Sequence, residues 1–236
     1  MQKNKIIFLI RAYNESTRIK GVIEGIIAAG YDQILVVDDG STDGTNDILS
    51  HLIQKGIIHF VHHATNRGAG AALETWFAYI RATHLQNHWK YLVTFDADGQ
   101  HDIKDMDRFI SAIKHDETLD VIFGSRFIIK TKTNVPFVRR MILWWWKIFT
   151  SLISGVHLTD AHNGYRMMRV EVLDKIHLTM DGMEYASELI DQIGSHKFHF
   201  TEVPVNIHYD EYTLWKWQRY GGAIRIAMRI LIKKFF

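Results

Sequence analysis

The sequence predicts an α/β fold with a mostly parallel central sheet and helices on both of its faces. In residues 1–125, short runs of β-branched and other apolar residues alternate with amphipathic spacers of helix length. The runs are apolar at consecutive positions, which is typical of parallel strands covered on both faces. Polar motifs follow three of these runs, at the positions where parallel sheets bind ligands.

Each predicted element corresponds to a distinct run of residues. The predicted strands are residues 5–10, 33–38, 57–62, 91–96 and 120–125. Helical periodicity predicts helices over residues 46–55 and 70–85. The less regular remainder is predicted to contain a basic, aromatic helix near 137–153, a strand near 164–169, a helix at 183–193, a strand at 199–205 and a basic tail.

The bulk composition fits one large folded domain, because the chain has 236 residues, of which 47% are apolar and 23% charged. No internal repeat, low-complexity segment or Pro/Gly linker interrupts it. We therefore expect a single domain over residues 1–211 and a basic amphipathic helix over 212–236. The chain has no cysteine, which excludes disulfide and thiolate chemistry. The first apolar run is too short for a signal peptide, so we expect a cytoplasmic protein.

Basic and aromatic residues gather in two stretches that contain no acidic residue. One lies between Asp120 and Asp160 and includes the consecutive tryptophans Trp144 to Trp146, and the other follows Glu211. No apolar run reaches the roughly 18–20 residues of a membrane span. The pattern predicts a peripheral contact with an anionic membrane surface, with docking of the tail helix on the domain as the alternative. Nucleic acid is disfavoured as a partner, because the basic residues lie on mixed apolar helices without a known binding module.

Two adjacent aspartates, Asp38 and Asp39, open the segment "DDGSTDGT" after a predicted strand. Neighbouring carboxylates repel each other unless something donates hydrogen bonds to them, and a nucleobase N–H and ribose hydroxyls are suitable donors. The pair therefore predicts a ligand contact for at least one of the two aspartates. The alternative is a turn in which Ser41 to Asp43 cap the next helix.

The segment "FDADGQH" places Asp96 and Asp98 where a predicted strand gives way to a loop. Both carboxylates can converge there on a divalent cation, which keeps waters and takes substrate phosphate oxygens as its other ligands. This combination suits a departing nucleotide diphosphate. The alternative is a helix N-cap formed by Asp98 or Asp102. His101, from its neighbours alone, could contact a phosphate.

Two further motifs receive a structural interpretation. The glycines of "NRGAGAAL" lack the third glycine of a dinucleotide fingerprint and the Gly-Lys-Ser/Thr of a P-loop, so we expect them to allow close packing at a helix start. The histidine pairs His62–His63 and His196–His199 have no companions at structural zinc spacing, which favours roles other than metal binding.

The segments "IRAYNES", "VVDDGSTDGT", "NRGAGAAL", "FDADGQH", "GSRF" and "DAHNGYR" stand in one order along the chain. In this order and spacing they resemble the family 2 inverting glycosyltransferases, which have the GT-A fold, a Rossmann-like nucleotide-diphospho-sugar transferase fold. Within that family the chain is most similar to the polyprenyl-phosphate sugar synthases of the dolichyl-phosphate mannose synthase group. The resemblance covers about residues 5 to 210, and the linked "VVDDGSTD" and "DADGQH" are its specific part.

The resemblance implies a sugar-nucleotide donor, held with Mg²⁺ or Mn²⁺. The implied metal ligands are Asp96, Asp98 and Gln100, which would hold the cation with the donor diphosphate. The residues expected around the donor are Ala12, Tyr13, Glu15, Asp38, Asp39, Asp96 and Ala97.

The chain departs from the family pattern at three positions. Arg11 stands where the family usually has proline, Ile103 replaces a frequent proline, and Trp76 occupies a position where a small residue is common. These departures leave the identity of the sugar nucleotide open, but not the reaction class.

Four residues are expected to act in catalysis. Asp98 would act through the cation, and Arg126 and Arg166 would steer the donor diphosphate or an acceptor phosphate, with a surface ion pair as the alternative. Glu188 shares a helical face with Glu184 and matches an acidic position of the family, so it is the preferred general base if the acceptor is a hydroxyl. The alternative for this face is ordinary solvent exposure.

The sequence therefore predicts a metal-dependent inverting hexosyltransferase on the cytoplasmic face of the membrane. It would move a sugar from a UDP- or GDP-sugar to polyprenyl phosphate. One alternative is the same donor chemistry onto a hydroxyl of a lipid-linked saccharide or surface glycan, and another is a non-catalytic sugar-nucleotide sensor.

Overall fold

A computed structural model describes residues 2–128, 156–161 and 163–208. Its centre is a seven-stranded sheet in the order β3-β2-β1-β4-β6-β5-β7, in which only β6 runs antiparallel to its neighbours. The strands are β1 Ile6–Ala12, β2 Ile34–Asp38, β3 His59–His62, β4 Tyr91–Asp96, β5 Val121–Ser125, β6 Arg166–Arg169 and β7 Phe200–Pro204. The predicted α/β class and mostly parallel sheet are confirmed. The predicted helices near 137–153 and over 212–236 lie outside the described residues.

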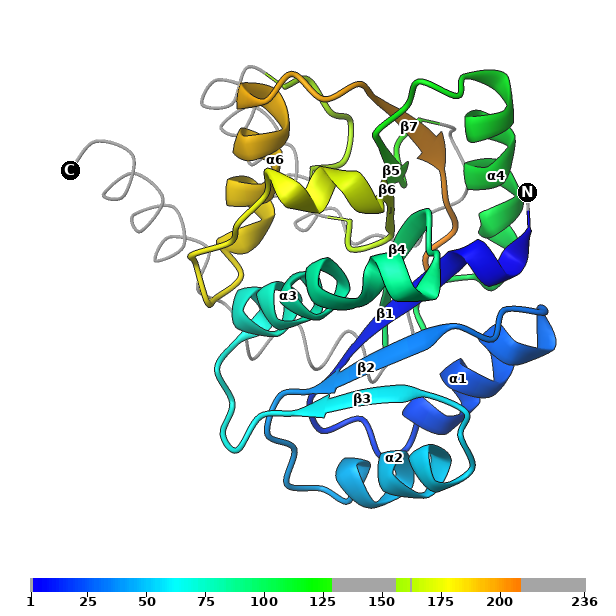
Figure 1. Ribbon diagram of the computed structural model, residues 1–236, viewed down its shortest axis with the longest axis vertical. Helices are drawn as coiled ribbons and strands as arrows, with labels where there is room; N and C mark the ends of the chain where they lie inside the picture. The colour runs from blue at the N-terminus through cyan, green and yellow to red at the C-terminus, as the bar shows by residue number, and fades with distance from the viewer. Residues whose placement is uncertain (1, 129–155, 162, 209–236) are drawn as a thin grey trace.

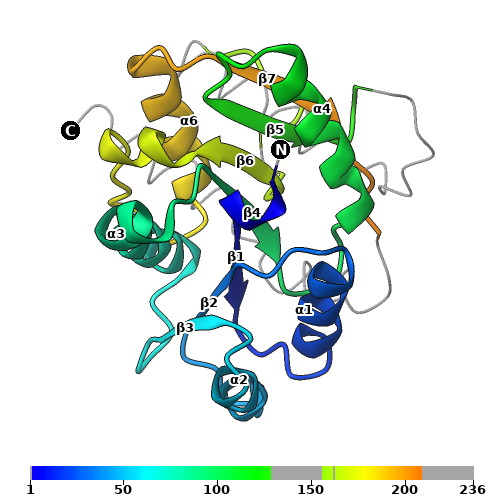
Figure 2. The same cartoon turned by 45° about the vertical axis from the view of Figure 1, so that its right-hand side comes forward.

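Helices cover both faces of this sheet (Figures 1 and 2). The helices are α1 Ile19–Ala28, α2 Thr45–Gln54, α3 Ala69–Asn87, α4 Met106–His115 and α6 Tyr185–Ser195, and three short 3₁₀ turns lie at Lys3–Lys5, Ile103–Asp105 and Val170–Asp174. The side chains of α1, α2 and α4 pack in one apolar cluster, and those of α3 and α6 pack in a second cluster on the opposite face. Among the described residues, no helix combines the length and apolarity that crossing a bilayer requires.

Strand β1 shows why its sequence is apolar at nearly every position. Phe8 and Ile10 belong to the cluster on the α1 face, whereas Ile7 and Leu9 belong to the cluster on the α3 face, and all four are fully buried. Successive side chains of a strand point to opposite faces, so a strand covered on both sides must be apolar throughout.

The carboxyl ends of β1, β2 and β4 meet the amino end of β6 at one edge of the sheet. Ala12 of β1 is in register with Asp38 of β2, and the preceding residue, Arg11, is in register with Asp96 of β4. Because β6 is antiparallel, it begins at this edge, with Arg166 opposite Thr94 of β4. The sheet thus collects polar side chains from segments more than a hundred residues apart at the edge where parallel sheets bind ligands.

Candidate active site

The loop after β1 is tied to the loop after β2 by side-chain hydrogen bonds. The backbone N–H of Asn14 donates to Ser41 Oγ at 2.9 Å, and that of Thr42 donates to Asn14 Oδ1 at 2.9 Å. The N–H of Glu15 donates to Thr45 Oγ1 at 2.9 Å. Ser41 and Thr42 therefore join the two loops and do not cap α2. Asp43 does, because its Oδ1 accepts from the N–H of Thr45, the first residue of α2, at 3.1 Å, so the predicted cap is confirmed for Asp43 alone.

Asp39 is fully buried, and donors from the chain surround its carboxylate. His63 Nδ1 lies 2.8 Å from Oδ1, which also accepts from the N–H of Arg67 at 3.0 Å, and Oδ2 accepts from the N–H of Gly68 at 2.9 Å. Its own N–H donates to the carbonyl of Ala12. Asp39 thus fixes the segment that leads into α3.

Asp38 is also fully buried and is satisfied in a similar way. Its Oδ1 accepts from Ser41, and its Oδ2 lies 3.1 Å from His62 Nδ1. The argument that the adjacent carboxylates of Asp38 and Asp39 need a ligand's donors is therefore wrong, because two neighbouring histidines supply them. A direct contact of either aspartate with the donor stays a prediction, as do those of Ala12, Tyr13, Glu15 and Ala97, which come from the family resemblance.

Asp96, Asp98 and Gln100 lie together at the end of β4. Asp98 Oδ1 accepts from the N–H of Gln100 at 3.1 Å, and Oδ2 accepts from Gln100 Nε2 at 2.9 Å. Arg18, just before α1, donates to the carbonyl of Asp98 at 3.1 Å and so anchors the loop. The side chain of Asp96 is 43% exposed.

The donor set of this loop fits a hard divalent cation. All the groups that Asp96, Asp98 and Gln100 can offer are oxygens, the ligand type that Mg²⁺ and Mn²⁺ prefer. Because Gln100 Nε2 donates to Asp98, Gln100 Oε1 is not used in that contact. The described residues contain no cluster of three His, Cys, Asp or Glu side chains able to hold a metal alone. A cation here would take its remaining ligands from water and substrate, as such sites usually do.

Asp96 is packed between His101 and Gly164. The two ring nitrogens of His101 each lie 3.3 Å from an atom of Asp96, one from its N–H and one from Oδ2. The ring also stacks on Tyr165, with centroids 4.8 Å apart. The pKa of His101 is lowered, mainly by burial. The charge of Asp96 raises this pKa, and the charge of Arg126 lowers it further. His101 is only 8% exposed and faces Asp96, a proposed metal ligand. A contact of His101 with a phosphate stays a prediction.

Gly164 permits this arrangement of Asp96, since a Cβ added at position 164 would lie 2.9 Å from Asp96 Oδ2. In the sequence, the segment "DAHNGYR" indicates only the family resemblance and the candidate Arg166. Its closeness to Asp96, like that of Arg18 to Asp98, comes from tertiary packing and has no local sequence signal.

Arg126 forms a buried ion pair with Asp160. Its Nε lies 2.6 Å from Asp160 Oδ2, its terminal NH2 lies 2.7 Å from Oδ1, and its backbone N–H also donates to Oδ2 at 3.1 Å. Both side chains are almost fully buried, so the alternative of a surface ion pair is wrong. Glu202 of β7 in turn accepts from the N–H groups of Thr159 and Asp160. A role of Arg126 in phosphate steering stays a prediction.

Arg166 is 1% exposed and forms no ion pair with a described residue. Its terminal NH2 donates to the carbonyl of Ala161 at 3.3 Å, and its guanidinium lies over the rings of Phe123 and Tyr185. Its Nε is buried and has no partner among the described residues. Burial lowers the pKa of Arg166, against the raising effects of Tyr185, Asp96 and Asp160. A buried guanidinium with an unused donor favours an anionic ligand nearby.

Glu188 holds a loop. Its carboxylate accepts from the hydroxyl of Thr179 at 2.6 Å, from the N–H of Thr179 at 3.0 Å and from the N–H of Met180 at 2.9 Å. The alternative of an ordinary solvent-exposed face is therefore wrong at this position. The predicted general-base role remains untested, but both oxygens of the carboxylate are engaged by residues 179–180.

The same loop packs on the start of α3. A Cβ added at Gly70 would lie 1.8 Å from the carbonyl oxygen of Met180, and one at Gly68 would lie 2.4 Å from that of Asp181. The N–H of Gly70 donates to the Asp181 carbonyl at 2.7 Å. The prediction that the glycines of "NRGAGAAL" allow close packing at a helix start is confirmed.

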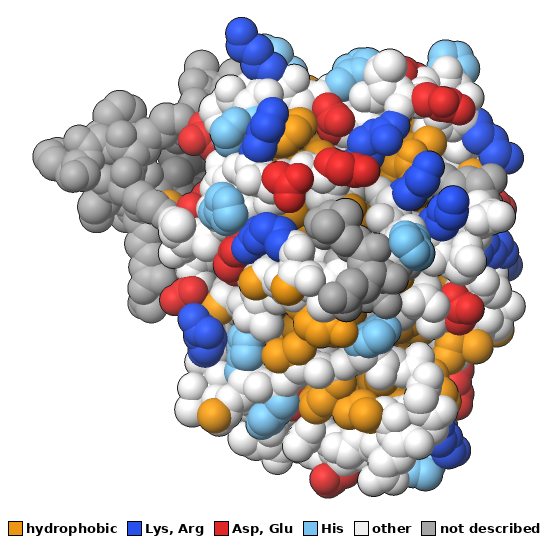
Figure 3. Space-filling model, in the orientation of Figure 1, with side chains coloured by type: hydrophobic (Ala, Val, Ile, Leu, Met, Phe, Trp, Pro, Cys, Tyr) orange, Lys and Arg blue, Asp and Glu red, His pale blue; other side chains and the backbone are white. Residues whose placement is uncertain are grey.

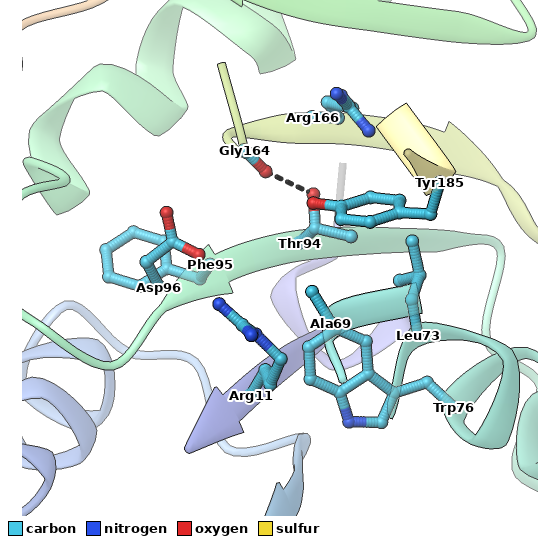
Figure 4. Close-up of a pocket in the computed structure, with 10 residues that line it drawn as sticks. All are labelled: Arg11, Ala69, Leu73, Trp76, Thr94, Phe95, Asp96, Gly164, Arg166 and Tyr185. Atoms are coloured by element: carbon cyan, nitrogen blue, oxygen red, sulfur yellow. Dashed lines mark hydrogen bonds between the residues drawn. The ribbon is translucent and has the colours of Figure 1, made fainter. Parts of the chain in front are cut away.

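A small recess opens beside Asp96 on the α3 face of the sheet (Figure 4). It encloses about 310 Å³, including the open space at its mouth. Arg11 rises from the end of β1 toward Asp96, and Arg166 and Tyr185 lie above β4 on the other side (Figure 4). Its lining residues are Arg11, Ala69, Leu73, Trp76, Thr94, Phe95, Asp96, Gly164, Arg166 and Tyr185. Two of the three positions that depart from the family pattern, Arg11 and Trp76, therefore line the same recess.

The chain is similar in sequence to known glycosyltransferases over most of its length. The sequence model described as Glycosyl transferase family 2 matches residues 7–177. The chain is 29% identical to a UDP-N-acetylglucosamine–dolichyl-phosphate N-acetylglucosaminyltransferase of Methanococcus voltae, over 98% of this chain and 97% of that protein. It is 30% identical to the polyprenol monophosphomannose synthase of Mycolicibacterium smegmatis, over 95% of this chain and 84% of the relative.

Solved structures share the fold at low sequence identity. Glucosyl-3-phosphoglycerate synthase of Mycobacterium tuberculosis, in complex with Mn²⁺, UDP and phosphoglyceric acid, aligns with a TM-score of 0.67 and 16% identity, over 97% of this chain and 77% of that one. Mannosyl-3-phosphoglycerate synthase of Rubrobacter xylanophilus aligns with a TM-score of 0.65 and 14% identity, over 97% and 74% of the two chains. The predicted GT-A fold is confirmed by these neighbours.

Proposed function

The chain belongs to glycosyl transferase family 2 and is a glycosyltransferase, and we propose that it transfers a sugar from a UDP- or GDP-sugar to polyprenyl phosphate. The observation that carries the proposal is the all-oxygen donor set of Asp96, Asp98 and Gln100 at the carboxyl edge of the sheet, beside the buried Arg166. Two relatives that cover nearly the whole chain bear names that specify a polyprenyl or dolichyl phosphate acceptor.

In the proposal, the loops after β1, β2 and β4 hold the donor at the carboxyl edge of the sheet. In the proposal, Asp96, Asp98 and Gln100 hold Mg²⁺ or Mn²⁺, which supplies Lewis-acid neutralisation of charge on the leaving diphosphate. Arg18 and His101 keep the carbonyl of Asp98 and the carboxylate of Asp96 in place. A structure that is ordered before the reaction stabilises developing charge without reorganisation, which is the main electrostatic contribution to catalysis.

The acceptor is proposed to be a phosphate because it needs no general base. A phosphate oxygen is already anionic near neutral pH, so it can attack the anomeric carbon as the bond to the donor diphosphate breaks and the electron pair leaves with the diphosphate. The carboxylate of Glu188, the preferred base for a hydroxyl acceptor, is engaged with Thr179 and Met180. One direct displacement of this kind inverts the anomeric configuration.

The membrane contact is proposed from the sequence. On the face shown in Figure 3, the Lys, Arg, Asp and Glu side chains of the described residues are interspersed rather than separated by sign. A polyprenyl acceptor lies in a membrane, and the basic, aromatic stretches at 130–147 and 215–234 have the composition of an interfacial anchor. We propose that these stretches bring the carboxyl edge to the cytoplasmic surface of the bilayer.

A transfer assay tests the proposal. Purified protein is incubated with radiolabelled UDP- and GDP-sugars, Mn²⁺ and polyprenyl phosphate, and both organic-phase label and released nucleotide are counted. We expect label in the organic phase with wild-type protein and with Glu188→Gln, provided that the variant unfolds at the wild-type temperature. A hydroxyl acceptor would be indicated instead if wild-type protein released nucleotide without labelling the lipid and Glu188→Gln did not release nucleotide. Absence of both signals with every donor would support a sugar-nucleotide sensor.

A further inference from the structure

The recess beside Asp96 holds donors that the rest of the described chain does not use. The side chain of Arg11 makes no hydrogen bond or ion pair with any described residue. The buried Nε1 of Trp76 and the buried Nε of Arg166 also have no partner among the described residues. Both of these side chains are more than nine-tenths buried, and buried donors without partners are rare in folded proteins.

The charges that line the recess favour an anion. Two guanidiniums, those of Arg11 and Arg166, line it together with one carboxylate, that of Asp96. In the proposed function the charge of Asp96 is directed to the cation, which leaves no other carboxylate in the lining of the recess to balance the two guanidiniums. An arginine matches the geometry of a carboxylate with two parallel hydrogen bonds.

The recess lies on the opposite side of Asp96 from the expected diphosphate. Asp98 is fixed by Arg18, and a Cβ at Gly99 would lie 3.9 Å from Val22 of α1, so this loop is on the α1 face of the sheet. The apolar walls of the recess, Leu73 and Trp76, belong to the cluster on the α3 face. A donor whose diphosphate sits at the α1 side would place its sugar, the next group along the molecule, toward the recess.

We infer that the recess binds a carboxylate carried by the donor sugar, so that the preferred donors are nucleotide diphosphate hexuronic acids. The inference rests on the proposed function, since it assumes that a sugar nucleotide occupies the carboxyl edge. Arg11 and Trp76 thereby become specificity-determining residues, and their joint departure from the family pattern has one physical explanation.

Equilibrium binding in the absence of acceptor tests this inference separately from transfer. The dissociation constants of UDP-glucuronic acid and UDP-glucose, and of GDP-mannuronic acid and GDP-mannose, are measured with Mn²⁺ for wild-type protein and for Arg11→Gln. Lys114→Gln, which removes one exposed positive charge on α4, is the matched control. Trp76→Phe removes the indole N–H and keeps an aromatic ring.

We expect wild-type protein to bind one uronic acid donor about tenfold or more tightly than its neutral partner, because a charge-assisted hydrogen bond discriminates on that order. Arg11→Gln should abolish most of this preference, Trp76→Phe should reduce it, and Lys114→Gln should keep it. Equal affinity for acidic and neutral donors in wild-type protein, or a preference that Arg11→Gln leaves intact, would overturn the inference.

Two further outcomes distinguish this inference from an acceptor phosphate in the recess and from the proposed function. If Arg11→Gln weakens binding of farnesyl phosphate and leaves the preference among donors unchanged, the anion in the recess is the acceptor phosphate and the inference is wrong. If the uronic acid preference is present but no donor supports transfer to polyprenyl phosphate, the recess assignment stands and the proposed function fails.

Discussion

The two halves of the carboxyl edge treat their polar groups in opposite ways. On the β1–β2 side, Asp38 and Asp39 are fully buried and receive hydrogen bonds from His62, His63 and backbone N–H groups. Around the recess beside Asp96, the side chain of Arg11 has no hydrogen-bond or ion-pair partner among the described residues, and Arg166 and Trp76 keep buried donors unused. The carboxylates of Asp38 and Asp39 therefore have their hydrogen-bond partners within the chain, whereas the donors around the recess are available to a ligand.

This difference separates residues that shape the site from residues that contact substrate. Where internal partners satisfy a carboxylate, its removal should reduce stability, because buried donors are left unpaired. Where donors are unused, their removal should change binding and leave the fold nearly as stable as before. Stability and activity measurements on matched variants can therefore tell the two halves apart.

The largest loss of stability is expected from Asp39→Ala. This change leaves His63 and the N–H groups of Arg67 and Gly68 without an acceptor. We expect the free energy of unfolding, measured by urea denaturation, to fall by about 3–5 kcal/mol. Asp32→Ala, at an exposed position, should change it by less than about 0.5 kcal/mol. A cost below about 1 kcal/mol for Asp39→Ala would show that the network does not support the fold.

A loss of activity at nearly unchanged stability is expected from Asp98→Asn. The variant keeps the shape of the side chain but removes a charged cation ligand, so kcat/KM for sugar transfer should fall by about 10²–10³-fold. The thermal unfolding temperature should stay close to that of wild-type protein. Unchanged turnover would contradict the assignment of Asp98 to the cation.

An intermediate loss of stability is expected from Gly70→Ala. The new Cβ would lie 1.8 Å from the carbonyl oxygen of Met180, so the loop that Glu188 holds must move away from α3. We expect the free energy of unfolding to fall by about 1–3 kcal/mol. Gly25→Ala, within α1 and with nothing near its added Cβ, should instead raise it by about 0.5–1 kcal/mol. Similar values for both variants would mean that the loop and α3 are not closely packed.

The smallest effect is expected from the carboxylate of Asp43, in the loop after β2. Partial burial raises the pKa of Asp43, but hydrogen bonds from Thr45 and Ser16 outweigh this, and the pKa lies below its usual value. The ionised form is therefore favoured by folding, and its contribution is present above about pH 4 and is lost as the pH falls through the lowered pKa.

For this exposed group the contribution should be about 0.5 kcal/mol. Urea denaturation of wild-type protein and Asp43→Asn should show that difference near pH 6 and a smaller difference near pH 3. A difference that grows as the pH falls would contradict the direction of the pKa shift.

The sequence predicted the parts of the molecule that local patterns encode. Apolar runs located the strands, and the motifs that follow them were expected at one edge, where Asp38 and Asp96 indeed lie. This prediction succeeds because a buried strand has a recognisable local pattern of apolar residues, and because parallel strands end at the same edge of a sheet.

The partners of those residues could not be predicted in the same way. The donors to Asp38 and Asp39 come largely from β3 and from the residues before α3, and the acceptor role of Glu188 depends on a loop eight to nine residues away. Such contacts are set by tertiary packing, so no local pattern marks them. The sequence consequently suggested ligand donors for two aspartates that the chain itself satisfies.

In the proposed site, Asp96, Asp98 and Gln100 bind a nucleotide diphosphate through a divalent cation. The measurement that tests this most directly is calorimetric titration of UDP and GDP into wild-type protein and Asp98→Asn, with Mn²⁺ and with the cation removed by chelation. We expect Mn²⁺ to strengthen binding of at least one nucleotide about tenfold or more in wild-type protein and to have little effect in Asp98→Asn. Equal affinity with and without Mn²⁺ in wild-type protein would contradict it.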